Sequence, residues 1–266
     1  MTLKAPLTAC FLVAGLVPAY AQETFDCLID PSLVVEVGSA ETGIIEEILV
    51  SRGDVVQQGQ PIAHLESAAE EASLAYTRAR ADDTTAIEIA QARVVLLAVA
   101  LERAETLAST NVLAAAALDE RRAEYEEAVL GVRQVEFERN LALLDQSRVE
   151  AQLARRIVRS PVDGLVVTAM VGPGEYAFSE APVVQIAQIS PLHVEVFLPT
   201  EYYPDMQLGD FANILPAEPI GGSYRAEIVV IDKVFDAASD TFGMRLRLAN
   251  DDQSIPAGID CRVSFD

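Results

Sequence analysis

The pattern of apolar and polar residues changes along the chain, and each change predicts a different secondary structure. From Leu33 to Leu65, β-branched residues are broken by glycines, a pattern typical of short strands joined by turns. From about Ser67 to Arg156 the chain has one glycine, Gly131, and no proline, and it is dominated by strong helix formers. We therefore expect a long helical segment, residues 67–156, inserted between β segments.

Within this segment the apolar positions step by sevens, as in a coiled-coil seam. The first half carries the series Ile87, Val94, Leu101, Ala108 and the series Ala90, Leu97, Ala104; the second half carries Leu118, Tyr125, Val132 and Ala128, Val135, Ala142, Val149. Arg139 and Gln146 interrupt the second half. A polar break at Ser109-Thr110-Asn111 separates the two registers, which predicts an antiparallel hairpin with its turn near 109–114, about 60 Å long. The alternative is one continuous helix of twice that length.

A repeat at a constant offset brackets the helical segment. Gly43, Gly53-Asp54, Pro61 and Leu65 recur 121 residues later as Gly164, Gly174-Glu175, Pro182 and Ile186. Half of such a unit could not bury its own apolar face. We therefore expect the half-motifs, residues 33–66 and 157–189, to pair in one small β domain.

The end of the chain returns to alternating segments. They are clear in His193–Leu198, Tyr224–Val230 and Phe242–Leu248, and Pro, Gly, Asp and Asn separate them. Short strands with regular turns are typical of a small closed barrel. The segment Phe25–Val37 can add a strand, so we assign residues 22–32 and 190–266 to this barrel.

Residues 1–21 have the features of a cleavable signal peptide. Lys4 precedes an apolar stretch from Leu7 to Val17, and Ala19-Tyr20-Ala21 places small residues at the cleavage site. About eleven apolar residues are too few for a membrane anchor. In a lipoprotein signal the apolar run precedes the cysteine, whereas here it follows Cys10. We expect export, and no later segment that spans a membrane.

The net charge limits the classes of binding partner, and the cysteine content indicates a disulfide. The net charge of −22 argues against nucleic acid or anionic lipid as the main partner, because both require basic patches. Removal of the signal peptide leaves Cys27 and Cys261, an even pair in a compartment that permits disulfides. We predict that they bond and so clamp the first strand to the last. The alternative is a pair of buried free thiols.

Candidate chemistry is sparse. His64 and His193 each stand alone among apolar neighbours in the sequence, and a lone histidine in a strand is usually structural. Cys27 and Cys261 lack the short spacing of a zinc site. No nucleophile, base and orienting group can be assembled from the sequence. We predict no enzyme and no catalytic, metal or cofactor site.

The order of these elements resembles the periplasmic adaptors, or membrane fusion proteins, a family that includes HlyD-like proteins and the adaptors of resistance-nodulation-division efflux pumps. The resemblance is carried by GIIEEILVSRGDVVQQGQPIAHLES, IVRSPVDGLVV, and DAASDTFGMRLRLAND followed by IPAGIDCRVSF. It implies an α+β fold, in which a biotinyl/lipoyl-like β domain is split by a long antiparallel coiled-coil hairpin and followed by a small β-barrel. Many relatives also have a membrane-proximal domain, whereas we expect no complete one here because the sequence stops where the barrel closes.

The same resemblance implies a docking site at the hairpin turn. Pump adaptors of this family carry Arg, Leu and Ser there with fixed gaps; Arg103 and Leu107 match the first two positions, and Ala114 stands at the third. The family's hydroxyl is therefore missing. Packing through Leu107, Val112 and Leu113 could still dock a channel, whereas Arg103 could equally be an ordinary solvated arginine.

The resemblance implies a bridging function without a cofactor. Its partners are an inner-membrane transporter, with the resistance-nodulation-division type favoured, an outer-membrane channel and further copies of the chain, in the periplasm and held at the inner membrane through those partners. Alternatives are an adaptor of an ATP-driven exporter or an envelope scaffold without a transporter. A lipoate or biotin carrier needs a lysine between the half-motifs, but the only lysines are Lys4 and Lys233.

Overall fold

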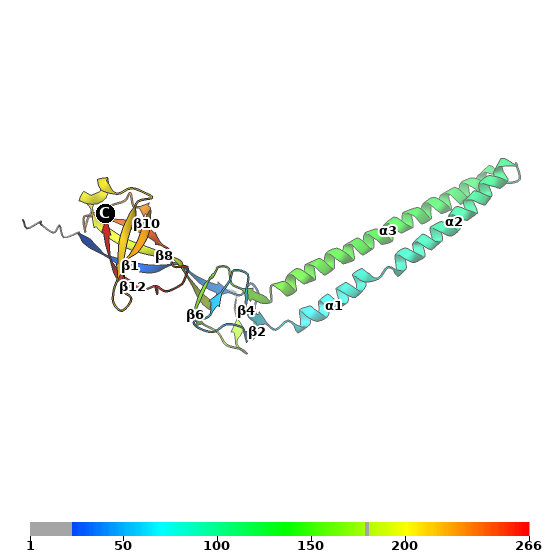
Figure 1. The fold of residues 1–266 in the computed structure, drawn as a ribbon. Coiled ribbons are helices and arrows are strands. Elements are labelled where there is room, and N and C mark those ends of the chain that lie inside the picture. The colour runs from blue at the N-terminus through cyan, green and yellow to red at the C-terminus, as the bar shows by residue number, and fades with distance from the viewer. Residues whose placement is uncertain (1–22, 179–180, 266) are drawn as a thin grey trace, which may run out of the picture. The chain divides into compact units, whose positions relative to one another are not determined.

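The computed structural model describes residues 23–178 and 181–265, and over these residues the chain forms two compact units (Figure 1). The barrel unit comprises the described residues up to Leu33 and from Gln188 onward. The arm unit is Val34–Ala187. The predicted signal peptide, residues 1–21, lies outside the described residues.

In the barrel unit, six of the described strands close on themselves. They are β1 (Thr24–Gly38), β12 (Ile259–Phe265), β9 (Phe211–Pro216), β10 (Tyr224–Ile231), β11 (Thr241–Leu248) and β8 (Pro182–Pro199), in that order, and a pairing of β1 with β8 completes the ring. A short 3-10 helix, η1 (Thr200–Asp205), follows β8. The boundary that we predicted at residue 190 lies inside the continuous strand β8, so the second half-motif leads into the barrel without a linker.

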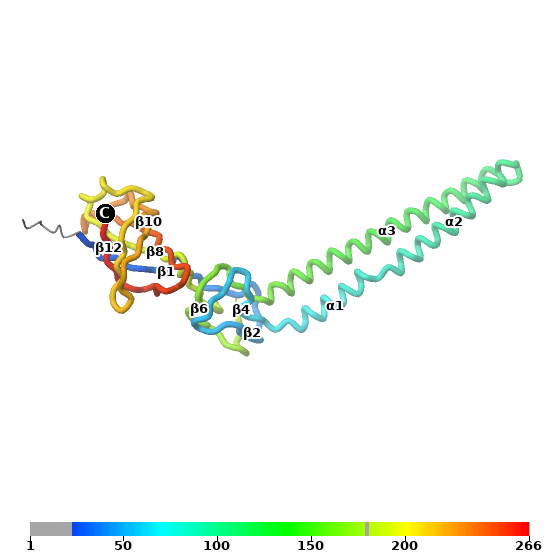
Figure 2. The backbone as a smooth tube through the Cα atoms, in the orientation of Figure 1, coloured from blue at the N-terminus to red at the C-terminus, as the bar shows by residue number. Residues whose placement is uncertain are grey.

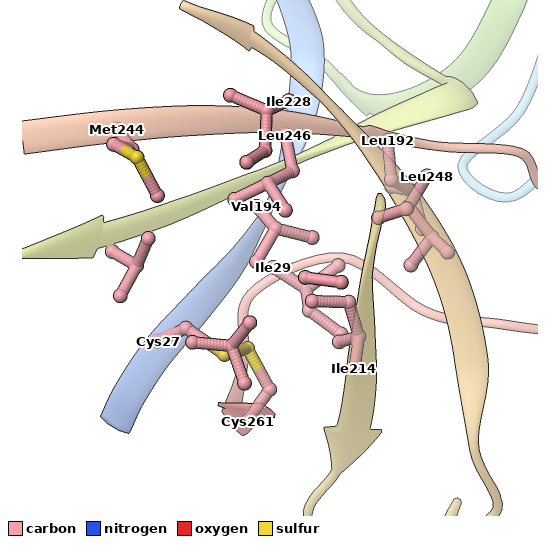
Figure 3. Packing of buried hydrophobic residues seen from close by; sticks show 14 of the residues in the cluster. Cys27, Ile29, Leu192, Val194, Ile214, Ile228, Met244, Leu246, Leu248 and Cys261 are labelled. Atoms are coloured by element: carbon pink, nitrogen blue, oxygen red, sulfur yellow. A yellow bond between two sulfur atoms is a disulfide. The ribbon is translucent and has the colours of Figure 1, made fainter. Parts of the chain in front are cut away.

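The barrel core follows from alternation along each strand. In β8, Val194, Val196 and Leu198 are buried, while Phe197 between them is exposed. Figure 3 shows such inward side chains from several strands packed around Ile29. Because successive side chains of a strand point to opposite faces, one apolar face per strand is enough to fill a closed barrel.

In the arm unit, the strands of the two half-motifs begin at the same offset of 121 residues. The first half-motif contributes β2 (Gly43–Ile48), β3 (Val55–Val56) and β4 (Pro61–Leu65), and the second contributes β6 (Gly164–Ala169), β7 (Tyr176–Ala177) and the start of β8. β5 (Ile157–Arg159) pairs with β4. Strands of one half-motif pair with strands of the other: β2 pairs with β7, and β3 pairs with β6. A single core, with Ile45, Ile62 and Ile186 fully buried, lies between them.

The backbone hydrogen bonds follow the same symmetry. Gly53 N–H donates to the Val166 carbonyl at 2.9 Å, and the equivalent Gly174 N–H donates to the Ile45 carbonyl at 2.8 Å. Both glycines have positive φ, 94° and 85°, a region that strongly favours glycine. The sequence repeat therefore corresponds to an approximate twofold in the folded domain.

The helical segment folds back on itself to form an arm. Its helices are α1 (Ala68–Asp82), α2 (Thr85–Ser109) and α3 (Ala115–Ala154). Both α1 and α2 pack along α3 (Figure 2). Residues of the predicted heptad series form the contact, and Ala104, Ala128, Ala142 and Val149 are buried. The apolar period of the sequence thus identifies the inward face of the arm.

The first side of the arm differs from the prediction, because it is interrupted rather than continuous. The Asp83 carboxylate, one residue before the N-cap Thr84, accepts the Thr85 N–H at 2.9 Å and so satisfies a first-turn donor of the new helix. Across the arm, Arg139 Nε donates to the Ala81 carbonyl at 3.1 Å, at the end of α1. A helix end leaves carbonyls without partners. The arginine that interrupts the heptad series therefore satisfies one of them.

Contrary to our expectation, a later segment has the length and composition of a membrane-spanning helix. Ala68–Ser109 includes an 18-residue stretch with a mean hydropathy of 1.6, none of which is buried. Isolated charges such as Arg93 interrupt its apolar runs but leave the mean hydropathy high. Exposed Ile89, Val95 and Leu96 are part of the arm surface.

Candidate functional site at the tip of the arm

The tip of the arm is a tight turn between α2 and α3. Asn111 has a φ of 54°, in the left-handed region, where Asn is tolerated better than most residues. Its N–H donates to the Ala108 carbonyl at 3.0 Å, and Val112 N–H donates to the Leu107 carbonyl at 3.1 Å. These bonds cap the end of α2 and fix the direction in which the chain reverses.

The tip presents apolar side chains to solvent. Leu107 is 45% exposed and Val112 is 72% exposed, while Leu113 is half-buried beside them. Exposed apolar groups gathered at the end of a long element mark a contact site more often than isolated ones do. The structure therefore brings the predicted residues Leu107, Val112 and Leu113 together.

Arg103 lies one helical turn before Leu107 and is exposed. The other arginines near the tip are paired: Arg121 lies 2.7 Å from Glu124, and Arg122 lies 3.5 Å from Glu105. Among the described residues, no ion pair involves Arg103 within 4.0 Å. Its guanidinium is available to an acidic or carbonyl partner.

Ala114 is the N-cap residue of α3. Its backbone is extended, with φ −67° and ψ 144°, and its side chain has no oxygen to accept an N–H of the first turn. Its carbonyl accepts the Leu118 N–H at 3.3 Å. At this position a serine would cap the helix, so the departure from the family pattern removes a stabilising group as well as a hydroxyl.

A cluster at the root of the arm, which the sequence did not reveal, joins the helices to the sandwich, the β domain that the two half-motifs form. Arg156 follows α3, and its Nε lies 3.1 Å from a Glu70 carboxylate oxygen in the first turn of α1. Its Nη1 donates to the Thr42 carbonyl at 3.1 Å, and its own carbonyl accepts the Leu65 N–H at 2.8 Å. Arg156, at the end of the helical segment, thus contacts Glu70 at its beginning and Leu65 of β4, the strand before it.

The lowered pKa of Glu70 and the room beside Gly43 are both consistent with the position of Arg156 at the root. Hydrogen bonding to Arg156 lowers the pKa of Glu70 below its ordinary value. A Cβ at Gly43 would lie 2.7 Å from Arg156 Nη1, so glycine leaves room for the guanidinium. Arg155 lies 3.3 Å from Glu41. The sequence signal was available in the basic pair that ends the helical segment.

Each histidine has a charged neighbour in the fold that its position in the sequence does not indicate. His64 Nδ1 lies 2.9 Å from the Glu47 carboxylate, because β4 pairs with β2. The pKa of His193 is lowered by burial and by Arg245 on the neighbouring strand. Over the part of the chain that is described, no group of three or more His, Cys, Asp or Glu side chains could hold a metal ion.

Cys27 and Cys261 are directly opposite each other on β1 and β12 and form a disulfide. Their Cα atoms are 4.8 Å apart, and both residues are buried among the barrel side chains (Figure 3). The sequence separation of 234 residues means that this bond ties together the two ends of the described chain.

A family model described as the CzcB-like, barrel-sandwich hybrid domain matches residues 33–188, more than half of the chain. An uncharacterized protein of Haemophilus influenzae is 19% identical over 212 residues, which are 80% of this chain and 48% of that protein. The chain therefore spans about half the length of this curated relative.

Solved structures share the fold. MacA from Actinobacillus actinomycetemcomitans matches with a TM-score of 0.68 and 18% identity, over 92% of this chain and 78% of that chain. The membrane fusion protein Spr0693 from Streptococcus pneumoniae R6 matches with a TM-score of 0.57 and 17% identity, over 92% of this chain and 98% of that chain.

Proposed function

The chain belongs to the membrane fusion proteins, or periplasmic adaptors, because it matches the CzcB-like barrel-sandwich hybrid domain, and we propose that it is the adaptor subunit of a tripartite efflux or secretion pump. In this role it bridges an inner-membrane transporter and an outer-membrane channel. The signal peptide of residues 1–21 delivers it to the periplasm, and its partners hold it at the inner membrane.

The tip of the arm is the observation that carries this proposal. A buried seam between α2 and α3 supports a coiled-coil hairpin that is stiff enough to hold a contact site far from the sandwich. Leu107 and Val112 form the apolar centre of that site, and Arg103 adds an unpaired cation at its edge. Apolar centres with a charged rim are typical of protein interfaces.

The proposed mechanism is geometric and involves no reaction. Several copies pack side by side, the arms together form a tube or funnel toward the outer-membrane channel, and the barrels seat on the transporter. The long exposed surface of the arm supports self-assembly, because nothing within the described part of the chain covers Ile89, Leu96 or Phe137.

The transporter class has two candidates. The gap between Arg103 and Leu107 favours a resistance-nodulation-division pump. Ala114, in place of the family serine, weakens that match, and an adaptor of an ATP-driven exporter is the second candidate. A scaffold that acts without a transporter is the remaining alternative.

Cross-linking in living cells, followed by purification of the tagged chain, tests the bridging role. We expect an inner-membrane transporter, an outer-membrane channel and further copies of the chain. Val112→Asp places a charge in the apolar tip and should abolish capture of the channel but not of the transporter. The control is Tyr76→Asp, at an equally exposed site on α1. Capture of no envelope protein and no second copy would contradict the role.

A further inference from the structure

A second heptad stripe runs along the outer side of α3. Its members are Ala123, Leu130, Phe137, Leu144 and Ala151, each seven residues from the next. Leu130, Phe137 and Leu144 are 60%, 61% and 67% exposed. From Leu130 on, each stripe residue lies two residues after a seam residue; Leu130, for example, follows Ala128. Two residues correspond to about 200° around a helix. The stripe therefore faces away from α1 and α2, which pack against the seam.

The stripe has the same order of side chains in both directions from Phe137. Leucine stands seven residues before and seven residues after it, and alanine stands fourteen residues before and fourteen after. The stripe is about 42 Å long at 1.5 Å per residue. Two such helices that lie antiparallel, with Phe137 facing Phe137, would place leucine against leucine and alanine against alanine along this whole length.

The polar residues beside the stripe complement themselves in the same arrangement. Antiparallel pairing about Phe137 brings Glu127 of one copy beside Arg148 of the other, and the twofold repeats this contact. Both side chains are exposed, and Arg148 is 58% exposed although it also contacts Asp145 at 2.8 Å. The remaining flanking pairs are Glu126 with Ser147, Arg133 with Asn140, and Gln134 with Leu141. None of these pairs opposes like charges.

We propose that the free chain pairs with a second copy of itself through α3, antiparallel, with Phe137 on the twofold axis. An interface of this kind uses the same surface on both partners and closes after two copies. It differs from the side-by-side assembly proposed above, because the tips of the two arms point in opposite directions. The pair is therefore a form of the unengaged chain, and its existence does not depend on the adaptor role.

Cysteine substitutions in the purified full chain test the pairing. Under mild oxidation, Phe137→Cys should form a covalent dimer, because residue 137 faces itself. Leu130→Cys alone should not, since residue 130 faces 144 and lies about 21 Å from its own copy. A mixture of Leu130→Cys and Leu144→Cys chains should cross-link to each other.

Each other outcome overturns the proposal. Dimers of Leu130→Cys alone would indicate parallel pairing. A Phe137→Cys chain that stays monomeric, at concentrations where the mixed cysteine pair also fails, would show that the stripe does not bind a second copy. Tyr76→Cys, exposed on α1, is the control for random collision and should stay monomeric.

Charge reversal provides a second readout that a merely structural effect would not reproduce. Arg148→Glu should weaken dimerisation by at least fivefold, because it places two acidic side chains together at each end of the interface. The double variant Glu127→Arg/Arg148→Glu restores opposite charges and should recover most of the affinity. If the double variant dimerises no better than Arg148→Glu, the antiparallel register is wrong.

Discussion

Arg156 binds Glu70 at the point where the arm leaves the sandwich. The two side chains come from opposite ends of the helical segment, 86 residues apart, and both are largely shielded, at 21% and 22% exposure. Because Arg156 also holds the Thr42 carbonyl, this cluster connects both sides of the arm to the first half-motif. We interpret it as the group that holds the arm in its position on the sandwich.

Replacing Glu70 by glutamine should lower the free energy of unfolding by about 1–2 kcal/mol at pH 7, because a charge-assisted hydrogen bond becomes a neutral one. The pKa of Glu70 is lowered in the folded chain from the ordinary value of 4.5. Its contribution is therefore fully present above pH 4.5 and is lost as the pH falls through the lower folded value. Urea unfolding of both chains between pH 7 and pH 3 should show the difference shrinking over that range.

A constant difference at all pH values would mean that Glu70 acts through packing rather than charge. Glu71→Gln, one residue further along α1 and exposed, is the matched control. It should leave the free energy of unfolding within about 0.5 kcal/mol of the unsubstituted chain.

Equivalent glycines of the two half-motifs should respond differently to alanine. A Cβ at Gly164 would lie 2.6 Å from the Ala187 carbonyl oxygen and 2.8 Å from Ile186 Cγ2, so the backbone must shift. At Gly43 the close atom belongs to the flexible Arg156 side chain. We expect Gly164→Ala to cost about 2–3 kcal/mol and Gly43→Ala less than about 1.5 kcal/mol in chemical unfolding. Equal costs would show that the two half-motifs are packed alike.

A serine at position 114 should stabilise the start of α3. The residue already has the extended backbone of an N-cap, so the new hydroxyl can accept an N–H of the first turn. We expect a gain of about 0.5–1 kcal/mol, seen as slower hydrogen exchange of the amides just after Ala115. The control Ala116→Ser places the hydroxyl inside the first turn, where serine is a weaker helix former, and should give no gain.

Removal of the barrel disulfide should destabilise the chain by about 2–5 kcal/mol. Cys27→Ser/Cys261→Ser and the reduced chain should unfold at similarly lower denaturant concentrations. A thiol-reactive label, added to the denatured but unreduced mature chain, should modify neither cysteine. Two labelled cysteines would show that the bond does not form.

The features visible in the sequence are those set by local pattern. The offset between Gly43 and Gly164 correctly predicts where β2 and β6 begin, because each half-motif carries its own turns and apolar positions. The heptad series likewise identifies the buried face of the arm, including Ala104 and Val149. Leu107 and Val112 come together at the tip because the polar break between them ends α2.

The features that sequence reasoning missed depend on which side chains meet in space. Pairing of β2 with β4 gives His64 its Glu47 partner, and no spacing in the chain indicates that contact. The break between α1 and α2 left two traces, a cluster of Asp and Thr around Asp83 and the interruption of the seam at Arg139. Only the fold places Arg139 beside the end of α1, where this break occurs.

Site-specific photo-cross-linking in cells tests the bridging role most directly. One chain carries the cross-linker at Val112 on the tip, and another carries it at Val234, which is 85% exposed in the barrel unit. The bridging role predicts that Val112 captures an outer-membrane channel protein and Val234 captures an inner-membrane transporter. Capture of the same protein from both positions, or of no envelope protein from either, would contradict it.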